Sequence, residues 1–279
     1  MSNNSKRTYW YYYLIIFLLL GGYLILHYRG GEGWYQWEKL GPKFRYRWTK
    51  NAASVRIPVE GPVITIPVSA ANPDIAQKPV KVKLSIDGQF IEEIVLRHRK
   101  WQSFDYLIPD PKKKSVELRF KVNRTWNPLE TIGSNDDRDL GAAVGPFSWK
   151  GWEIGSRVGF YDQEMGDNGT SFRWTRKQAS IMLAVKGTVL SIPIQAVHPH
   201  MGRNPVKVEV FMDDKLWDTV VLKKGGWWEV LEYKLPSWDK KALKLTFKVD
   251  RTWSPLEARY NNNDPRDIGV AIGEIFWKD

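Results

Sequence analysis

Cysteine is absent from the 279-residue chain. This absence excludes disulfide bonds, thiolate metal sites, a cysteine nucleophile and a lipidated N-terminal cysteine. It does not identify a compartment, because proteins without thiols occur in oxidising and reducing environments alike. The hydrophobic fraction of 43% is ample for packed cores, so the composition is that of a globular protein.

Motifs of the common enzyme classes are also missing: the sequence has no nucleophile elbow, phosphate-binding loop or His-Glu-x-x-His pattern. His198 and His200 flank a proline without a third ligand, which favours a surface loop over a metal site. The oxygen-rich runs at 166–170 and 261–264 lack an ordered calcium loop and are typical of ordinary turns. We therefore expect no catalytic residue, no cofactor and no metal site.

Basic side chains outnumber acidic ones, 42 to 31, which gives a formal net charge of +11. This balance favours anionic surroundings such as lipid headgroups, acidic glycans, nucleic acid or an acidic protein face. The densest basic run, at 112–114, follows a proline in a turn, whereas nucleic-acid readers concentrate basic residues on a helix or stripe. Nucleic acid is therefore not an expected partner, while anionic glycans and lipid headgroups remain candidates.

One long hydrophobic run lies near the N-terminus, where residues 9–26 read YWYYYLIIFLLLGGYLIL without a charge. At about 1.5 Å per residue this run covers roughly 27 Å, enough to cross the hydrocarbon core of a bilayer. The sequence predicts a transmembrane helix over about 9–27, with aromatic residues at the interfaces and a glycine pair for close helix packing. The anchor residues are Tyr9, Trp10, Tyr13, Gly21, Gly22 and Tyr28.

The flanks of this run indicate an uncleaved anchor and its orientation. The following segment, HYRGGEGW, offers no small-x-small site for signal peptidase. Lys6 and Arg7 precede the run, and basic residues favour the cytoplasmic side. We expect a single-pass protein of the bacterial inner membrane whose bulk lies on the periplasmic side.

The rest of the chain consists of two copies of one pattern. The matches include GWYQWE at 33–38 with GFYDQE at 159–164, YRWTK at 46–50 with FRWTR at 172–176, and KPVKV at 78–82 with NPVKV at 204–208. A period of this length is typical of tandem domains, since solenoid repeats are shorter. The predicted organisation is a tail and helix at 1–32, a first domain at 33–150, a linker at 151–158 and a second domain at 159–279.

Each copy is made of short β-branched and aromatic runs separated by Gly, Pro, Asn and Asp. The run VKVKLSI at 80–86 alternates strictly between apolar and polar residues, as in a sheet with one buried and one wetted face. No long amphipathic helix is indicated after the N-terminal segment. The sequence predicts an all-β fold: two tandem antiparallel β-sandwiches, immunoglobulin-like or jelly-roll, after one transmembrane helix.

The repeat separates structural tryptophans from candidates for binding, because a residue that holds the fold should occur in both copies. Four pairs do so, namely Trp48/Trp174, Trp101/Trp228, Trp126/Trp253 and Trp149/Trp277. The remaining tryptophans considered have no tryptophan counterpart, and tryptophan is enriched at interface hot spots. These interaction candidates are Trp34, Trp37, Trp152, Trp217, Trp227 and Trp238.

A crowded acidic motif, Asp-x-Arg-Asp, also occurs in both copies, after a tryptophan and before a glycine. By the same test it is a structural corner, in which the arginine forks across carboxylates or carbonyls and the glycine admits the next strand. An active site is the alternative, but it would need an acid of raised pKa, which a neighbouring arginine opposes. The corner residues are Trp126, Asp136, Arg138, Gly141, Trp253, Asp264, Arg266 and Gly269.

The order G-(W/F)-Y-x-x-E, (Y/F)-R-W-T, R-T-W-x-P-L-E and D-x-R-D-(L/I)-G resembles that of uncharacterised bacterial β-sandwich domains. Such domains occur in membrane-anchored proteins, or appended to membrane glycosyltransferases and O-antigen-ligase-like proteins. The resemblance covers both copies but not the anchor. It implies an accessory domain with the architecture of a carbohydrate-binding module, and it supplies no established binding residue.

These features are compatible with three functions. The first is a non-catalytic accessory subunit whose tandem sandwiches scaffold or clamp other subunits of a membrane complex, with Trp34 and Trp37 against the membrane surface or a partner. The alternative is a cell-surface glycan-binding protein that uses Trp217, Trp227 and Trp238 as stacking platforms. A polysaccharide hydrolase, which would need a carboxylate pair in a cleft, ranks third.

Overall fold

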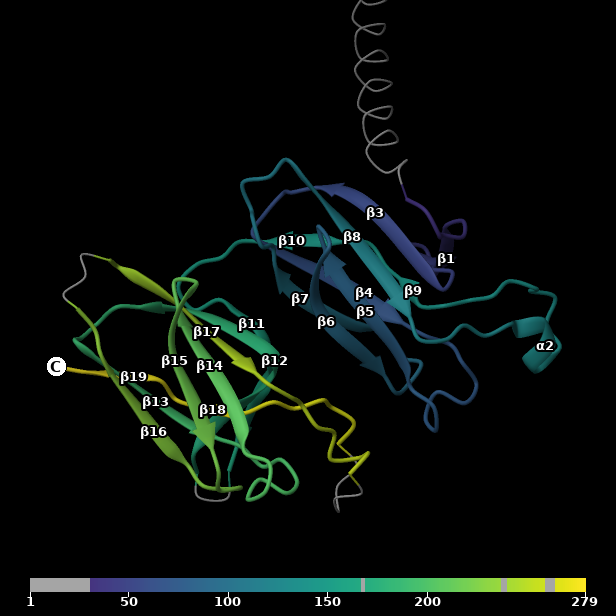
Figure 1. The fold of residues 1–279 in the computed structure, drawn as a ribbon. Coiled ribbons are helices and arrows are strands. Elements are labelled where there is room, and N and C mark those ends of the chain that lie inside the picture. Colours follow the sequence, from purple (N-terminus) through teal and green to yellow (C-terminus); the bar gives the residue numbers. More distant parts are fainter. Residues whose placement is uncertain (1–30, 167–168, 237–239, 259–263) are drawn as a thin grey trace, which may run out of the picture. The chain divides into compact units, whose positions relative to one another are not determined.

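A computed structural model describes residues 31–166, 169–236, 240–258 and 264–279 (Figure 1). The predicted transmembrane segment, with its anchor residues from Tyr9 to Tyr28, lies outside the described residues. Trp238 and residues 261–263 lie outside them too. No helix in the described part is long and apolar enough to cross a membrane.

The described part of the chain is all-β and its strands pair in antiparallel sheets, which confirms the prediction of an all-β, antiparallel chain. The chain divides into two units. The first unit runs from residue 31 to 103 and from 108 to 149, and the second comprises 104–107 and the described residues from 150 to 279.

The first unit is built from two antiparallel sheets, one of which also includes residues 104–107 and Lys150, although these residues group with the second unit. One has the order β1-β2-β9-β4-β10, with β7 also paired to β4, and the other has the order β3-β8-β5-β6. The strands of the first sheet are β1 (Glu38–Leu40), β2 (Phe44–Trp48), β4 (Val63–Ser69), β7 (Gln102–Leu107), β9 (Ala143–Val144) and β10 (Ser148–Lys150). Those of the second are β3 (Ala52–Pro58), β5 (Val80–Ile86), β6 (Gln89–Leu96) and β8 (Ser115–Val122). The one helix in the described part, α2 (Pro128–Ile132), lies between β8 and β9.

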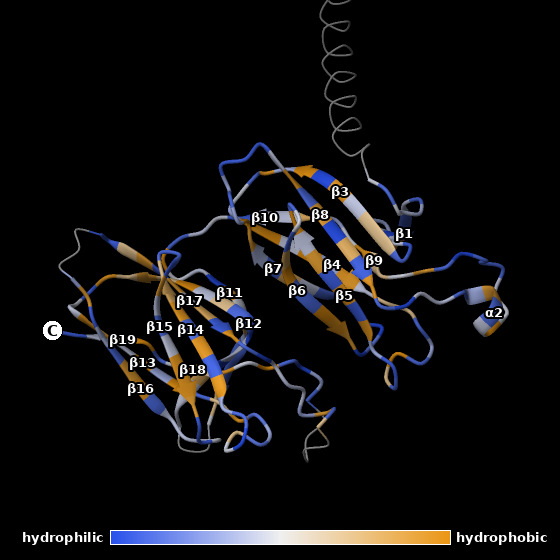
Figure 2. Cartoon of the chain, in the orientation of Figure 1, coloured by the Kyte–Doolittle hydropathy of each residue, from blue (hydrophilic) through white to orange (hydrophobic). Residues whose placement is uncertain are grey.

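Strand β5 shows why these residues form a sandwich. Val80, Val82 and Leu84 are fully buried, whereas Lys81 and Lys83 between them are exposed. Burying each such apolar side chain contributes roughly 1.5–3 kcal/mol, and shifting the strand by one residue would bury the lysines instead. The alternation therefore determines both the strand and its buried face. Strands of each unit carry strongly hydrophobic and strongly hydrophilic residues (Figure 2).

The second unit has equivalent strands, but they form a single connected sheet. Its order is β15-β14-β17-β12-β18-β13-β16, with β11 paired to β12 and β19 to β13. Its strands are β11 (Arg157–Met165), β12 (Ser171–Ala184), β13 (Val189–Gln195), β14 (Val206–Met212), β15 (Lys215–Leu222), β16 (Glu229–Lys234), β17 (Ala242–Val249), β18 (Ala271–Gly273) and β19 (Phe276–Lys278). The strands equivalent to the two separate sheets of the first unit are connected here because β12 is one strand of 14 residues. The matching stretch of the first unit is interrupted between β2 and β3.

The pairing register is the same in the two units. Trp48 pairs with Ala143 in the first unit, and Trp174 pairs with Ala271 in the second. Val55 likewise pairs with Leu118, as Ile181 pairs with Leu245. Equivalent positions of the two units can therefore be compared residue by residue.

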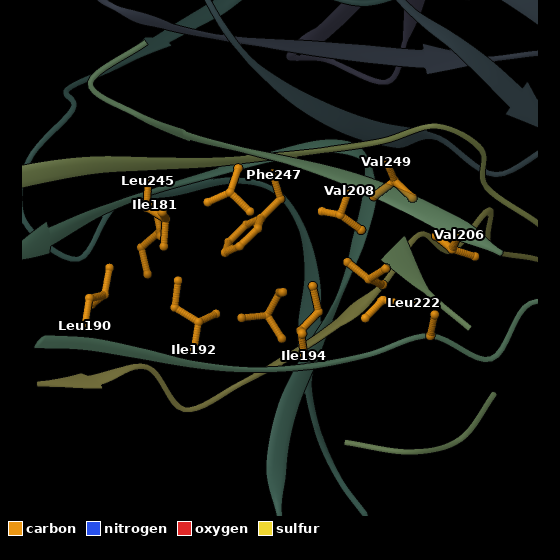
Figure 3. Packing of buried hydrophobic residues seen from close by; sticks show 14 of the residues in the cluster. Ile181, Leu190, Ile192, Ile194, Val206, Val208, Leu222, Leu245, Phe247 and Val249 are labelled. Carbon is orange, nitrogen blue, oxygen red and sulfur yellow. The ribbon is translucent and has the colours of Figure 1, made fainter. Parts of the chain in front are cut away.

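The core of the second unit lies between its two layers of strands. Figure 3 shows Leu190, Ile192 and Ile194 of β13 pointing toward Phe247 and Val208 on the opposite layer. All five side chains are fully buried. Removing a ring such as Phe247 would leave a cavity in this layer, at a typical free-energy cost of about 3–5 kcal/mol.

Candidate functional site

The repeated Asp-x-Arg-Asp motif forms the same ion-pair arrangement in each unit. In the first, Arg138 Nε and Nη2 donate to the Asp136 carboxylate at 2.8 and 2.7 Å. Arg138 Nη2 also lies 2.8 Å from Glu38 Oε1 on β1. The arginine thus ties the loop before β9 to the first strand of the sheet.

In the second unit, Arg266 contacts Asp264 Oδ2 at 2.7 Å and Glu164 Oε1 on β11 at 2.6 Å. Hydrogen bonds from Arg138 hold the pKa of Asp136 below its usual value. Burial alone would raise the pKa of Asp264, but the hydrogen bonds and charge of Arg266 outweigh it, so this pKa is lowered as well. Acids held ionised in this way are unsuited to proton donation, which a glycosidase would require of one of its two carboxyl groups.

Gly141 and Gly269 are needed at the corner because the backbone approaches another strand closely. A Cβ at Gly141 would lie 2.4 Å from Thr49 Oγ1, and one at Gly269 would lie 2.5 Å from Thr175 Oγ1. Each threonine oxygen also accepts a hydrogen bond of 3.0 Å from the residue after the glycine. Steric room, and not a left-handed backbone, is therefore what the two glycines supply.

Trp126 and Trp253 complete the two corners. Trp126 forms an isolated bridge with Leu140, and Trp253 forms the matching bridge with Ile268. Both rings are half-buried and pack against small apolar clusters that contain Trp48 in the first unit and its counterpart in the second. The corner residues therefore occupy equivalent places in both units.

The prediction that His198 lies in a surface loop is wrong, because the side chain is only 5% exposed. Its Nε2 lies 3.1 Å from the carbonyl oxygen of Arg251, and its ring lies 6.2 Å from that of Trp253. Burial lowers the pKa of His198 to about 4. Within the described residues, no three histidine, aspartate or glutamate side chains are grouped as metal ligands.

Because His198 is buried in its neutral form, we expect the free energy of unfolding to depend on pH. Its pKa is about 4 when folded and about 6.5 when unfolded, so the unfolded chain takes up a proton that the folded chain refuses. Stability is therefore complete above pH 6.5 and falls between pH 6.5 and 4, by about 2 kcal/mol from pH 7 to pH 5. Urea midpoints at the two pH values measure this loss.

The matched control is His198→Asn, because Asn72 occupies the equivalent position of the first unit. The variant should lose the dependence between pH 7 and pH 5, whatever its absolute stability. The lowered aspartate pKa values act in a separate window below pH 4. An equal loss in wild type and variant would mean that another group titrates.

Trp34 and Trp37, both without tryptophan counterparts, cover one arginine of the first unit. The Arg47 guanidinium carbon lies 3.9 Å from the Trp34 ring centre and 4.9 Å from that of Trp37. Trp34 also donates from Nε1 to the Ser54 carbonyl at 2.7 Å and packs edge-on against Phe120 at 5.6 Å. Trp34 is therefore part of the packed unit, while Trp37 is 46% exposed.

The other interaction candidates are dispersed. Trp217 on β15 is half-buried against the core of the second unit. Trp227 is 68% exposed and lies in the loop after β15, with Lys224 Nζ 5.6 Å from its ring centre. Leu222, the last residue of β15, lies five positions after Trp217, which is roughly 17 Å along the strand. Trp152 is half-buried just before β11.

A pocket of about 360 Å³ opens on the side of the second unit. Strands β11, β12 and β18 and the residues after β18 form its walls. We call it the side pocket and define it by Arg157, Phe160, Gln163, Arg173, Glu274 and Ile275. Its volume lies near the lower end of the usual range for small-ligand sites, about 300–1,000 Å³.

The side pocket exists where the first unit has its two unpaired tryptophans. Pairing register and the GWYQWE/GFYDQE match make Phe160 equivalent to Trp34, and Gln163 equivalent to Trp37. The arginine is kept, since Arg173 occupies the place of Arg47. Smaller side chains at two positions therefore leave open the space that indole rings occupy in the first unit.

Two cationic groups dominate the side pocket. Arg173 donates from Nη1 to the Tyr161 carbonyl at 3.1 Å and from Nη2 to Gln163 Oε1 at 3.3 Å. Burial, together with the charge of Arg173, lowers the pKa of Arg157. Glu274 is the one acid among the lining residues. The pocket thus combines several apolar side chains with two guanidinium groups on a largely polar surface, and it suits a ligand that carries a ring and a negative charge.

The tryptophans that occur in one copy alone do not mark the side pocket, because Trp34 and Trp37 lie beside Arg47 in the other unit. The informative signal was their replacement in the other copy. Phe160 and Gln163 stand inside an otherwise matching hexapeptide, and a loss of ring volume beside a retained arginine is visible in the sequence once the two copies are aligned.

No protein-family model and no curated protein matches the chain. Among solved structures, it is similar to a catalytic domain with two CBM51 domains from Clostridium perfringens ZmpB, at 11% identity and a TM-score of 0.23, covering 89% of this chain and 38% of that one. It is also similar to a cycloalternan-forming enzyme from Listeria monocytogenes in complex with pentasaccharide substrate, at 11% identity and a TM-score of 0.28, covering 84% and 20%. The ANXUR2 extracellular domain from Arabidopsis thaliana has 10% identity and a TM-score of 0.26, with 87% of each chain covered. The chain spans well under half of the two bacterial proteins, and no function is carried over from similarities at these TM-scores.

Proposed function

We propose that this chain is a non-catalytic accessory subunit of a membrane complex, and that its second unit binds another subunit through the side pocket. The observation that carries this proposal is the difference between the two units. The first fills the space beside Arg47 with its own indole rings, whereas the second leaves about 360 Å³ open beside Arg173. A pocket of this size holds water, and a ligand that displaced the water would bury the apolar surface of side chains such as Phe160 and Ile275.

The N-terminal segment supports the membrane part of the proposal. Its 18 uncharged apolar and aromatic residues suit a single-pass anchor in a bacterial inner membrane, with both units on the periplasmic side. Trp37, which precedes β1, and Leu40, the last residue of β1, are 46% and 54% exposed. These two side chains provide apolar area for a membrane surface or a neighbouring subunit close to the anchor.

Filling the side pocket tests this function. The filled variant transplants the first-unit residues as Arg157→Gly, Phe160→Trp and Gln163→Trp. The glycine is included because a Cβ at its counterpart Gly31 would lie 2.8 Å from the Trp34 ring. The full chain is purified in mild detergent, and co-purifying subunits are quantified by mass spectrometry. We expect a stoichiometric partner with wild type and a loss of about ten-fold or more with the filled variant, as for a hot-spot contact.

Trp227→Ala is the matched control, since this exposed ring lies outside the side pocket and its loss should leave partner recovery unchanged. Equal recovery with the filled variant would contradict the proposed function. If wild type carries no partner at all, the glycan-binding alternative becomes the better account, and exposed Trp227 is the ring to test on a glycan array. Glycan binding that Trp227→Ala abolishes would establish that alternative.

A further inference from the structure

We propose that the side pocket receives one aromatic side chain from an acidic segment of the partner. The ring would lie against the Arg173 guanidinium, and an adjacent carboxylate would lie near Arg157. This inference rests on the proposed function and adds the chemistry of the contact.

The first unit shows what the walls of this space accept. There the occupant is an indole, held by the guanidinium carbon of Arg47 at 3.9 Å from the ring centre. The second unit keeps the arginine and the backbone register around it. The same cation–π contact is therefore available to a ring that comes from another chain.

The size of the pocket limits the occupant. About 360 Å³ is near the minimum for a small-ligand site. The opening accommodates one side chain with its flanking backbone more readily than an extended oligosaccharide. The apolar side chains among the lining residues, including Phe160 and Ile275, suit the body of an aromatic ring.

Charge selects the sequence context of that ring. Arg157 has no counterpart charge in the first unit, where Gly31 occupies the equivalent position. With Arg173 it places two positive charges against Glu274 alone. A neighbouring aspartate or glutamate on the incoming segment would compensate this excess, in keeping with the chain's net charge of +11.

The test uses defined dipeptides titrated calorimetrically into the full chain in detergent. The probes are N-acetyl-Asp-Trp-amide, N-acetyl-Lys-Trp-amide and N-acetyl-Asp-Ala-amide. We expect the Asp-Trp probe to bind wild type and to bind the filled variant at least about ten-fold more weakly. Removing the ring should abolish measurable binding, and exchanging Asp for Lys should weaken it about five-fold. Arg173→Lys keeps the positive charge but loses the planar guanidinium. Binding of the Asp-Trp probe should therefore weaken, whereas a contact made through charge alone would be kept.

Two results would overturn the inference. One is equal binding of Asp-Trp to wild type and to a filled variant whose thermal melting shows that it folds. The other is the absence of any Asp-Trp binding to wild type while filling the pocket still removes the partner, which would leave the proposed function standing with a different ligand chemistry. Retention of the partner by the filled variant would instead reject the proposed function itself.

Discussion

Replacing Gly269 by alanine is expected to destabilise the second unit by about 3 kcal/mol or more, at the upper end for overpacking. The new Cβ would lie 2.5 Å from Thr175 Oγ1 and 2.7 Å from the Arg176 carbonyl oxygen. Neither atom can move freely, because Thr175 is fully buried and its Oγ1 accepts the hydrogen bond from Val270. The melting temperature of this unit should fall by roughly 10 °C, as measured by calorimetry.

Gly202→Ala is the matched control, because a Cβ there would meet nothing within 4 Å. It should change stability by less than about 1 kcal/mol. Gly141→Ala should produce the large loss in the first unit instead, since its Cβ would lie 2.4 Å from Thr49 Oγ1. If Gly269→Ala melts with wild type, the close approach at the corner does not constrain this position.

The opened variant, Trp34→Phe with Trp37→Gln, should have the second large effect. It gives the first unit the residues that border the side pocket in the second. Replacing Trp34 would remove the hydrogen bond to the Ser54 carbonyl and the indole contacts with Phe120 and Arg47. We expect the first unit to lose about 2–4 kcal/mol, by analogy with other ring truncations in packed sites.

Trp37→Gln alone separates the two contributions. Because Trp37 is 46% exposed, its replacement should cost less than about 1 kcal/mol. Chemical denaturation followed by near-ultraviolet circular dichroism measures both variants. A full loss in the single variant would show that Trp37, and not Trp34, fills the space beside Arg47.

Alternating strands and repeated motifs were sufficient to predict the all-β, antiparallel chain. Val80, Val82 and Leu84 mark the buried face of β5, because a period of two has few alternatives in a seven-residue run. The continuous path of the second unit was less accessible to sequence reasoning. It depends on β12 continuing through the stretch where the first unit breaks between β2 and β3, and neighbouring strands decide that outcome.

The candidate site was harder to predict because it depends on volume. A tryptophan without a counterpart suggested a surface contact, yet Trp34 is packed and bonded within its own unit. Counting rings cannot show which neighbour they cover. In the structure, Trp34 and Trp37 lie against Arg47. This contact is what shows that the smaller side chains of Phe160 and Gln163 leave space open at the equivalent positions.

His198 and the corner glycines illustrate two other limits. A histidine beside a proline is usually exposed, but here a neighbouring loop covers it and its Nε2 contacts the Arg251 carbonyl. Gly141 and Gly269 were expected to admit the next strand, which identified the positions without showing the obstacle. The nearby threonine oxygens are contributed by residues more than ninety positions away, so the restriction is a tertiary one.

The number of Asp-Trp probe sites on the chain is the most direct measurement of the difference between the two units. Calorimetric stoichiometry should give one site for wild type, none for the filled variant and two for the opened variant. The second site of the opened variant should be the weaker one, because Gly31 stands where the second unit has Arg157. A wild-type chain without a site, or a folded filled variant that still binds one probe, would contradict the claim that missing indole rings create a binding pocket.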